Sequence, residues 1–177
     1  FGEDAKAWQP VLEKIKTPWA SQVTPEKVWS EYPRPALVRK EWENLNGLWE
    51  YAITPTHVEK PGEYDGNILV PFPVESGLSG VHEHPGMEKC LWYRRSFEVP
   101  KEWDARERRI LLHFGAVDWH ATVWVNDRYA GEHKGGFDPF TFDITDLLTP
   151  SGSQQVVVKV WDPTDQGTQP RGKQVTE

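Results

Sequence analysis

The sequence predicts an all-β protein, a sandwich or barrel of short strands. From residue 47 onward, short apolar runs alternate with Gly, Pro, Asn and Asp, a pattern typical of that class. The chain is long enough for one domain, since a domain near its 177 residues hides roughly 70% of its unfolded surface. Its ten Trp, seven Phe and five Tyr supply large rings to fill a core.

The first 35 residues differ from the rest. Apolar side chains recur at three- and four-residue intervals between residues 4 and 16, which predicts a short helix that Thr17-Pro18 ends. Several prolines between residues 18 and 35 favour an extended lead laid over a neighbouring surface. We therefore expect residues 1–35 to be a helix and extended lead packed on a β-sandwich of residues 36–177.

Alternating side chains mark the strands of the sandwich. In residues 91–99 mostly apolar positions alternate with mostly polar ones, so one face of the strand is apolar. Residues 119–125 alternate in the same way, and Asn126-Asp127 then signals the turn of a hairpin. The predicted strands are residues 48–53, 68–72, 91–99, 109–114, 121–125, 141–144 and 156–161.

Charge and hydropathy exclude two classes of partner. The chain has 20 basic and 27 acidic residues, and its net charge of −7 would repel a phosphate backbone, so nucleic acid is not expected. No apolar run approaches the roughly 20 residues that span a bilayer, and the first residues lack an export-signal pattern. Cys90 is the only cysteine, so no disulfide forms within the chain.

Motifs for catalysis or metal binding are weak. Ser79 lies in Gly-Leu-Ser-Gly, which differs in order from a nucleophile elbow, and we interpret it as part of a tight turn. Residues 82–84 with Glu88 offer metal-ligand types, but Gly and Pro around them indicate an exposed loop without fixed geometry. Gly135-Gly136 lacks the strand-to-helix context of a phosphate loop. We expect no metal and no cofactor.

Two pairs of carboxylates raise the possibility of a two-carboxylate hydrolase. In the pair Asp138 and Asp143, the second is more simply a turn residue. Asp162 and Asp165 directly follow an apolar strand, where a loop can project them to a site. The alternative for these two is an ordinary solvated loop.

Three segments in order carry a family resemblance: Leu-Asn-Gly-Leu-Trp at 45–49, Val-Pro-Phe-Pro-Val-Glu-Ser at 70–76 and Trp-Tyr-Arg-Arg-Ser-Phe at 92–97. With residues 112–126 and 131–145 they resemble the sugar-binding N-terminal domain of glycoside hydrolase family 2, the β-galactosidase, β-glucuronidase and β-mannosidase group. Residues 161–167 and 170–174 resemble a subgroup of bacterial polysaccharide-degrading members. The resemblance covers nearly the whole chain.

The resemblance implies a galactose-binding-like jelly roll that packs against an immunoglobulin-like domain and a TIM barrel. The barrel would supply both glutamates of a retaining exo-glycosidase, β-galactosidase-like, so no residue of this chain is expected to be catalytic. In the family a further segment and a closing strand follow residues 170–174. We therefore expect the sandwich of residues 36–177 to lack its final strand. The sequence leaves the localisation of the parent protein open, and a bacterial protein that is periplasmic or secreted is favoured.

By the same resemblance, loops 75–81 and 162–171 reach the mouth of the active site. The expected carbohydrate contacts are Glu75, Ser76, Asp162, Asp165 and Arg171. Asp162 or Asp165 would accept hydrogen bonds from sugar hydroxyls, and Arg171 would pair with a carboxylate or backbone group. The alternatives are a free-standing carbohydrate-binding module and a purely structural packing domain. The sequence does not decide the sugar, the linkage or the oligomeric state.

Overall fold

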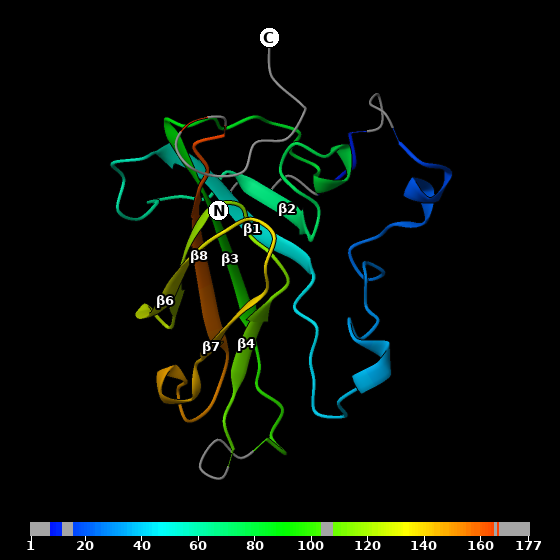
Figure 1. The fold of residues 1–177 in the computed structure, drawn as a ribbon, viewed down its shortest axis with the longest axis vertical. Coiled ribbons are helices and arrows are strands. Elements are labelled where there is room, and N and C mark those ends of the chain that lie inside the picture. Colours follow the sequence, from blue (N-terminus) through cyan, green and yellow to red (C-terminus); the bar gives the residue numbers. More distant parts are fainter. Residues whose placement is uncertain (1–7, 12–15, 104–107, 165, 167–177) are drawn as a thin grey trace, which may run out of the picture. The chain divides into compact units, whose positions relative to one another are not determined.

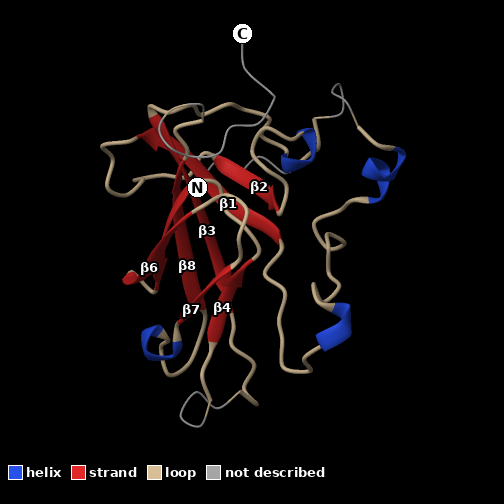
Figure 2. Ribbon diagram, in the orientation of Figure 1, coloured by secondary structure: helices blue, strands red, loops and turns tan. Residues whose placement is uncertain are grey.

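The computed structural model describes residues 8–11, 16–103, 108–164 and 166. In these parts of the chain all helical turns are short 3-10 segments, and strands make up the rest of the regular structure (Figures 1 and 2). The strands are β1 (Gly47–Pro55), β2 (Gly66–Val70), β3 (Lys89–Phe97), β4 (Leu111–Phe114), β5 (His120–Val125), β6 (Arg128–Lys134), β7 (Phe140–Asp143) and β8 (Gln154–Trp161). The 3-10 segments are η1 (Pro18–Gln22), η2 (Pro35–Leu37), η3 (Gly77–Ser79) and η4 (Thr145–Leu147).

The chain divides into two compact units. The first comprises residues 1–51 and 64–84, and the second comprises residues 52–63 and 85–177. In the first unit the beginning of β1 pairs with β2 in an antiparallel ladder that runs from Gly47 opposite Val70 to Tyr51 opposite Gly66. Its 3-10 turns and irregular lead belong to the same unit.

The second unit is built on β8. This strand pairs antiparallel with β3 along one edge, where Leu91 faces Val160, and with β5 along the other, where His120 faces Trp161. Strand β6 continues the sheet beyond β5, and the turn between them has positive φ at both Asn126 and Asp127, as a two-residue hairpin turn requires. Strands β4 and β7 form a separate two-stranded sheet.

The two sheets of the second unit pack through an apolar core. On the inner face the odd-numbered residues of β5 and even-numbered residues of β8 are buried, namely Ala121, Val123, Val125, Gln154, Val156, Val158 and Val160. From the second sheet, the Phe140 ring stacks on Phe114 with centroids 4.7 Å apart and on His133 of β6 at 4.3 Å. At Gly131 of β6 an added Cβ would lie 2.3 Å from the Phe142 ring, so only glycine permits this approach.

The outer face of the larger sheet also carries a packed layer. Trp92 is 1% exposed there, stacks on Trp124 at 5.9 Å and donates its indole N–H to Thr54 Oγ1 at 2.9 Å. The Lys159 ammonium lies 5.0 Å from the Trp92 ring centroid and donates to the Val58 carbonyl at 3.2 Å. Residues 54–58, at the end of β1 and directly after it, therefore cover part of this face.

These observations confirm the predicted all-β class, the jelly-roll β-sandwich. Each predicted strand overlaps an observed one, and β6 is the hairpin partner predicted after the Asn126-Asp127 turn. The predicted boundaries err by at most two residues; β3, for example, ends at Phe97 instead of Val99. Phe97 is paired with Gln154, the first residue of β8, so the ladder ends where the partner strand begins.

The predicted helix over residues 4–16 is wrong for residues 8–11, which are not helical. The Val11 N–H donates to the Gly77 carbonyl at 2.8 Å, and the Trp8 indole N–H donates to the Ser79 carbonyl at 3.0 Å. The Val11 N–H therefore cannot donate within a helix, because it donates to a distant loop, and Pro10 has no N–H to donate. Residues 8–11 therefore bond to that loop instead of forming a helical turn, and residues 4–7 and 12–15 of the predicted helix lie outside the described residues.

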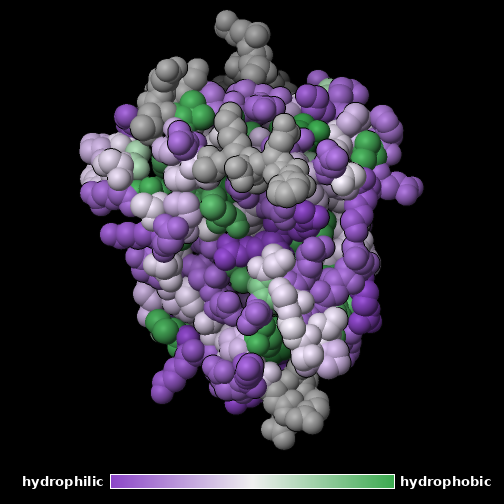
Figure 3. Space-filling model, turned by 180° about the vertical axis from the view of Figure 1, so that it is seen from behind, coloured by the Kyte–Doolittle hydropathy of each residue, from purple (hydrophilic) through white to green (hydrophobic). Residues whose placement is uncertain are grey.

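Over the face shown in Figure 3, hydrophilic side chains predominate and apolar ones occur in small groups. Among the residues that the structure describes, the large apolar side chains with most exposure include Trp19, Trp29, Leu37 and Phe137, the last 77% exposed. Scattered exposed apolar residues of this kind are ordinary on protein surfaces. In the same parts of the chain, no helix is long and apolar enough to cross a membrane.

The stacked core ring gives a test of the sandwich. Replacing Phe140 by Ala is expected to lower the free energy of unfolding by about 3–5 kcal/mol, because a buried ring is lost. The control Phe137→Ala removes an exposed ring of the same type and should stay within about 0.5 kcal/mol of the parent. The free energy of unfolding of the parent and of the two variants can be measured by urea unfolding. Equal losses of stability in the two variants would show that Phe140 does not lie in the core.

Candidate functional site

The loop after β2 is organised by a buried serine. Ser79 is 0% exposed, and its hydroxyl lies 2.7 Å from the Ser76 carbonyl and 3.0 Å from the Val74 carbonyl. The same oxygen accepts from the backbone N–H groups of Val81 and His82 at 3.0 and 3.3 Å. Its hydroxyl is thus fully used in closing the turn, which agrees with the interpretation of Ser79 as a turn residue.

Glu75 and Ser76 lie together at the start of this turn. The Ser76 side chain accepts from the Leu78 N–H at 3.2 Å and so caps η3. The Glu75 side chain is exposed, while its carbonyl is 2.6 Å from Nδ1 of His82. Because a carbonyl only accepts, that ring nitrogen carries the proton, and the other ring nitrogen of a neutral His82 is an acceptor. The loop therefore presents a carboxylate and an imidazole on a fixed backbone.

The predicted residues of the second loop lie in the second unit. Asp162 follows β8 directly, is half-buried, and its Oδ1 accepts from the Thr164 N–H at 2.7 Å in an Asx turn. Gln166 N–H donates to the Pro163 carbonyl at 3.0 Å, which continues the turn. Asp165 and Arg171 lie outside the described residues. Of the five predicted contacts, the structure thus brings Glu75 and Ser76 into one loop and places Asp162 in another.

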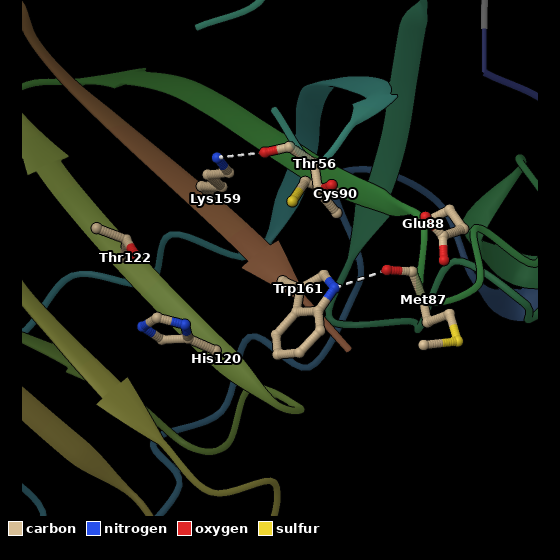
Figure 4. A pocket seen from close by; sticks show the side chains of 8 residues that line it. All are labelled: Thr56, Met87, Glu88, Cys90, His120, Thr122, Lys159 and Trp161. Carbon is tan, nitrogen blue, oxygen red and sulfur yellow. Dashed lines mark hydrogen bonds between the residues drawn. The ribbon is translucent and has the colours of Figure 1, made fainter. Parts of the chain in front are cut away.

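A hollow that the sequence analysis did not anticipate lies on the outer face of the larger sheet (Figure 4). It has a volume of about 440 Å³. Its lining comes from three neighbouring strands and two flanking segments: Thr56, Met87, Glu88, Cys90, His120, Thr122, Lys159 and Trp161. The alternation in residues 119–125 and 156–161 contained the signal, since it puts His120, Thr122, Lys159 and Trp161 on the non-core face of paired strands.

Hydrogen bonds fix the walls of this hollow. The Trp161 indole N–H donates to the Met87 carbonyl at 2.8 Å, and His120 Nε2 lies 3.0 Å from Glu132 Oε2. Lys159 Nζ is 3.2 Å from the Val58 carbonyl. Burial raises the pKa of the Cys90 thiol, an effect that the charge of Lys159 partly offsets. At neutral pH the thiol is therefore a neutral, weakly polar group in the lining.

The other carboxylates considered as a catalytic pair have structural partners. Asp138 Oδ2 lies 3.0 Å from His133 Nε2. Asp143 Oδ1 accepts from both the backbone N–H and the hydroxyl of Thr145, and its Oδ2 accepts from Arg109 at 2.5 Å. Both carboxylates therefore hold local turns. Within the described ranges, no group of three or more His, Cys, Asp or Glu side chains is arranged to hold a metal ion.

Residues 55–169 match the family described as glycosyl hydrolases family 2, sugar binding domain. A β-glucuronidase of Paenibacillus borealis is 29% identical over 148 residues, which are 80% of this chain and 24% of that protein. A β-galactosidase of Thermoanaerobacter pseudethanolicus is 42% identical over 57 residues, 32% of this chain and 7% of that protein.

Solved structures of β-glucuronidases are also similar to this chain. A Lactobacillus rhamnosus β-glucuronidase superposes with a TM-score of 0.55 at 30% identity, covering 68% of this chain and 21% of that one. A Faecalibacterium prausnitzii β-glucuronidase gives 0.53 at 31% identity, covering 67% and 20%. The chain therefore spans about a quarter or less of the length of the relatives it matches.

Two glycines test the docking of Trp8 on the first loop. Gly80 and Gly86 have φ of +84° and +70°, but an added Cβ meets the Trp8 ring at 2.5 Å only at Gly80 and open space at Gly86. Gly86→Ala should lower the unfolding free energy by about 1–2 kcal/mol for the left-handed backbone alone, and Gly80→Ala by more. In a Trp8→Ala background the Gly80→Ala loss should fall toward the Gly86→Ala value, with a remainder from the Gln9 carbonyl, which lies 3.1 Å from the added Cβ. An unchanged loss in that double variant would mean that the Trp8 contact is unimportant.

Asp143 gives a pH dependence. Its hydrogen bonds from Thr145, with a smaller contribution from Arg109, hold the pKa of this carboxyl below its ordinary value of 3.8. Since the unfolded chain then binds the proton more tightly, the carboxylate stabilises the fold above pH 3.8 and loses that effect as the pH falls through the lower folded pKa. Asp143→Asn should reduce the slope of stability against pH in this acid range, whereas Asp146→Asn, in the same turn, should preserve the Asp143 effect. Thermal unfolding of both variants should be measured between pH 2 and 5, roughly the range in which carboxylates titrate. Equal slopes of stability against pH in the two variants would show that Asp143 is not the source of this pH dependence.

Proposed function

The chain belongs to the sugar-binding domain family of the family 2 glycosyl hydrolases, and on that premise we propose that it is a non-catalytic domain that positions carbohydrate in a multidomain glycosidase. The observation that carries this proposal is the family match over residues 55–169 in a chain that spans only 20% to 24% of the β-glucuronidases it resembles. The remaining three quarters of such a protein has room for an immunoglobulin-like domain and a catalytic barrel, which we propose as the partners of this chain.

The chemistry of the described residues supports a non-catalytic role. A retaining glycosidase needs a nucleophile and an acid/base about 5 Å apart, with both carboxyl groups directed at the sugar. Asp138 instead bonds to His133 of β6, and Asp143 bonds to Thr145 in its own turn and to Arg109 before β4. One carboxylate oxygen of Asp162 accepts a hydrogen bond from the Thr164 N–H. These residues act as local supports.

Glu75, Ser76 and Asp162 are proposed carbohydrate contacts, together with Asp165 and Arg171. The Glu75 carboxylate is exposed on a backbone that the Ser79 hydroxyl holds in place, and the Ser76 hydroxyl still has a proton to donate after accepting from Leu78. Groups fixed before a sugar binds lose little entropy when they contact it. A rigid loop of this kind suits the orientation of a substrate.

For the parent protein we propose a retaining exo-glycosidase. The relatives named above are mostly β-glucuronidases, and the β-galactosidase matches over a shorter stretch. β-Glucuronides are therefore the first substrate class to test and β-galactosides the second. The parent's two barrel glutamates, and hence its anomeric specificity, belong to the part of the protein beyond the family match.

Nitrophenyl glycosides test the proposed role of this chain and the proposed activity of the parent enzyme. The 177-residue chain alone should release no nitrophenol from the β-glucuronide or the β-galactoside, whereas the parent enzyme should act on one of them. In the parent, Glu75→Gln and Asp162→Asn should each lower kcat/KM by about tenfold or more, since a hydrogen bond to a charged group contributes roughly 1.5–3 kcal/mol. Glu63→Gln, an exposed carboxylate on another loop, is the matched control and should leave kcat/KM unchanged.

Two results would contradict the proposal. Turnover by the chain alone that Asp162→Asn abolishes would make this domain catalytic. Kinetics of Glu75→Gln and Asp162→Asn that equal those of the Glu63→Gln control would leave only a packing role, because neither side chain would then contribute to the transition state.

A further inference from the structure

The hollow on the outer face of the larger sheet has the features of a small ligand site. It lies wholly within the second unit, over β3, β8 and β5, and its volume of about 440 Å³ falls in the range of small-molecule sites, roughly 300–1,000 Å³. Figure 4 shows its side chains arriving from separate strands, with Trp161 at the end of β8 and His120 at the start of β5. The site is thus built by sheet register, because His120 and Trp161 are directly paired and Thr122 is paired with Lys159.

Trp161 supplies an apolar surface whose orientation is fixed. Its indole N–H is bonded to the Met87 carbonyl at 2.8 Å, so the polar edge of the ring is satisfied and the ring itself is left to pack against a ligand. The side chain is only half-buried, although it lies in the strand at the centre of the sheet. An aromatic face next to polar groups suits the apolar face of a pyranose ring.

The polar groups around Trp161 suit hydroxyl groups. His120 Nε2 is held by Glu132 at 3.0 Å, so in the neutral ring Nδ1 is the acceptor. Thr122 both donates and accepts, and the exposed Glu88 carboxylate only accepts. Sugar hydroxyls, which donate and accept, match this mixture.

The charges favour an uncharged ligand. Lys159 is the cation of the lining, but its ammonium lies on the Trp92 ring and is bonded to the Val58 carbonyl, with a longer contact of 3.5 Å to the Thr56 carbonyl. The lining also holds the Glu88 carboxylate, which would repel an anion. Lys159 and Glu88 therefore offset each other, which disfavours a phosphate or another strong anion.

We infer that this hollow is a binding site for a neutral pyranose residue, with Trp161 as its apolar platform and His120, Thr122 and Glu88 as its hydrogen-bonding groups. The inference goes beyond the proposed function and does not depend on it, because none of the residues that line the hollow is among the carbohydrate contacts proposed above. Binding is expected to be weak, since a single sugar ring has few atoms, with a dissociation constant of about 1 mM.

Titration of the 177-residue chain with methyl β-D-glucopyranoside, followed by amide and indole N–H NMR, tests the site. The Trp161 indole signal should shift with saturation. Thr122→Tyr fills the hollow with a side chain that strands accept well, and Trp161→Leu removes the platform. Each should weaken binding about tenfold or more, a change of 1.4 kcal/mol. Phe137→Ala, which removes an exposed aromatic ring elsewhere in this unit, should bind like the parent.

The outcomes separate the alternatives. Saturation that Thr122→Tyr abolishes supports the site even if Trp161→Leu fails to fold. No saturable shift at about 10 mM, tenfold above the expected constant, would overturn it, as would binding that Thr122→Tyr leaves unchanged. Methyl β-D-glucuronide serves as the anionic comparison. If it binds through Trp161 while the neutral glycoside does not, the neutral ligand class is wrong and Lys159 is an anion contact. None of these results depends on the activity of the parent enzyme.

Discussion

The second unit depends on β8, a strand that is hydrogen-bonded along both edges and packed on both faces. Val156, Val158 and Val160 turn to the inner core, and the alternate positions carry Val157, Lys159 and Trp161 on the other face. A strand in this position has no edge exposed to another molecule, and its β-branched side chains fit the pleated surface. At its first residue, Gln154 is 3% exposed but bonded to Asn126 and Thr149, so the beginning of the strand carries no unsatisfied amide.

Sequence patterns reveal a strand such as β5 well because buried and half-buried positions alternate regularly along it. The alternation in 121–125 and the turn residues Asn126 and Asp127 specify a hairpin by local rules alone, and the structure contains that hairpin. The same local rules mislead at residues 8–11. There the Trp8 side chain and the Val11 backbone bond to Ser79 and Gly77, about 70 positions away in the chain, and no local pattern encodes such contacts.

The candidate sites also divide into features that the sequence predicts and features that depend on contacts between distant parts of the chain. Sequence resemblance pointed to Glu75, Ser76 and Asp162, and the structure shows what the residue types alone do not, namely that Ser76 caps η3 and Asp162 closes an Asx turn. The hollow at Trp161 escaped the sequence analysis because its lining comes from segments that meet only when β3, β8 and β5 pair. Register across strands can be described once the sheet order is known, but the sequence does not specify that order.

The position of the hollow follows from how the outer face is covered. The segment after β1, which contains Thr56 and Val58, covers part of this face. Lys159 holds that segment in place, because its ammonium donates to the Val58 carbonyl and also lies over the Trp92 ring. Thr56 of this segment lines the hollow, and the next cross-strand row, His120 with Trp161, remains half-buried. The same ammonium that anchors the cover therefore also forms one wall of the hollow. A ligand held there would contact groups already fixed by the fold, and its binding would cost the protein little conformational entropy.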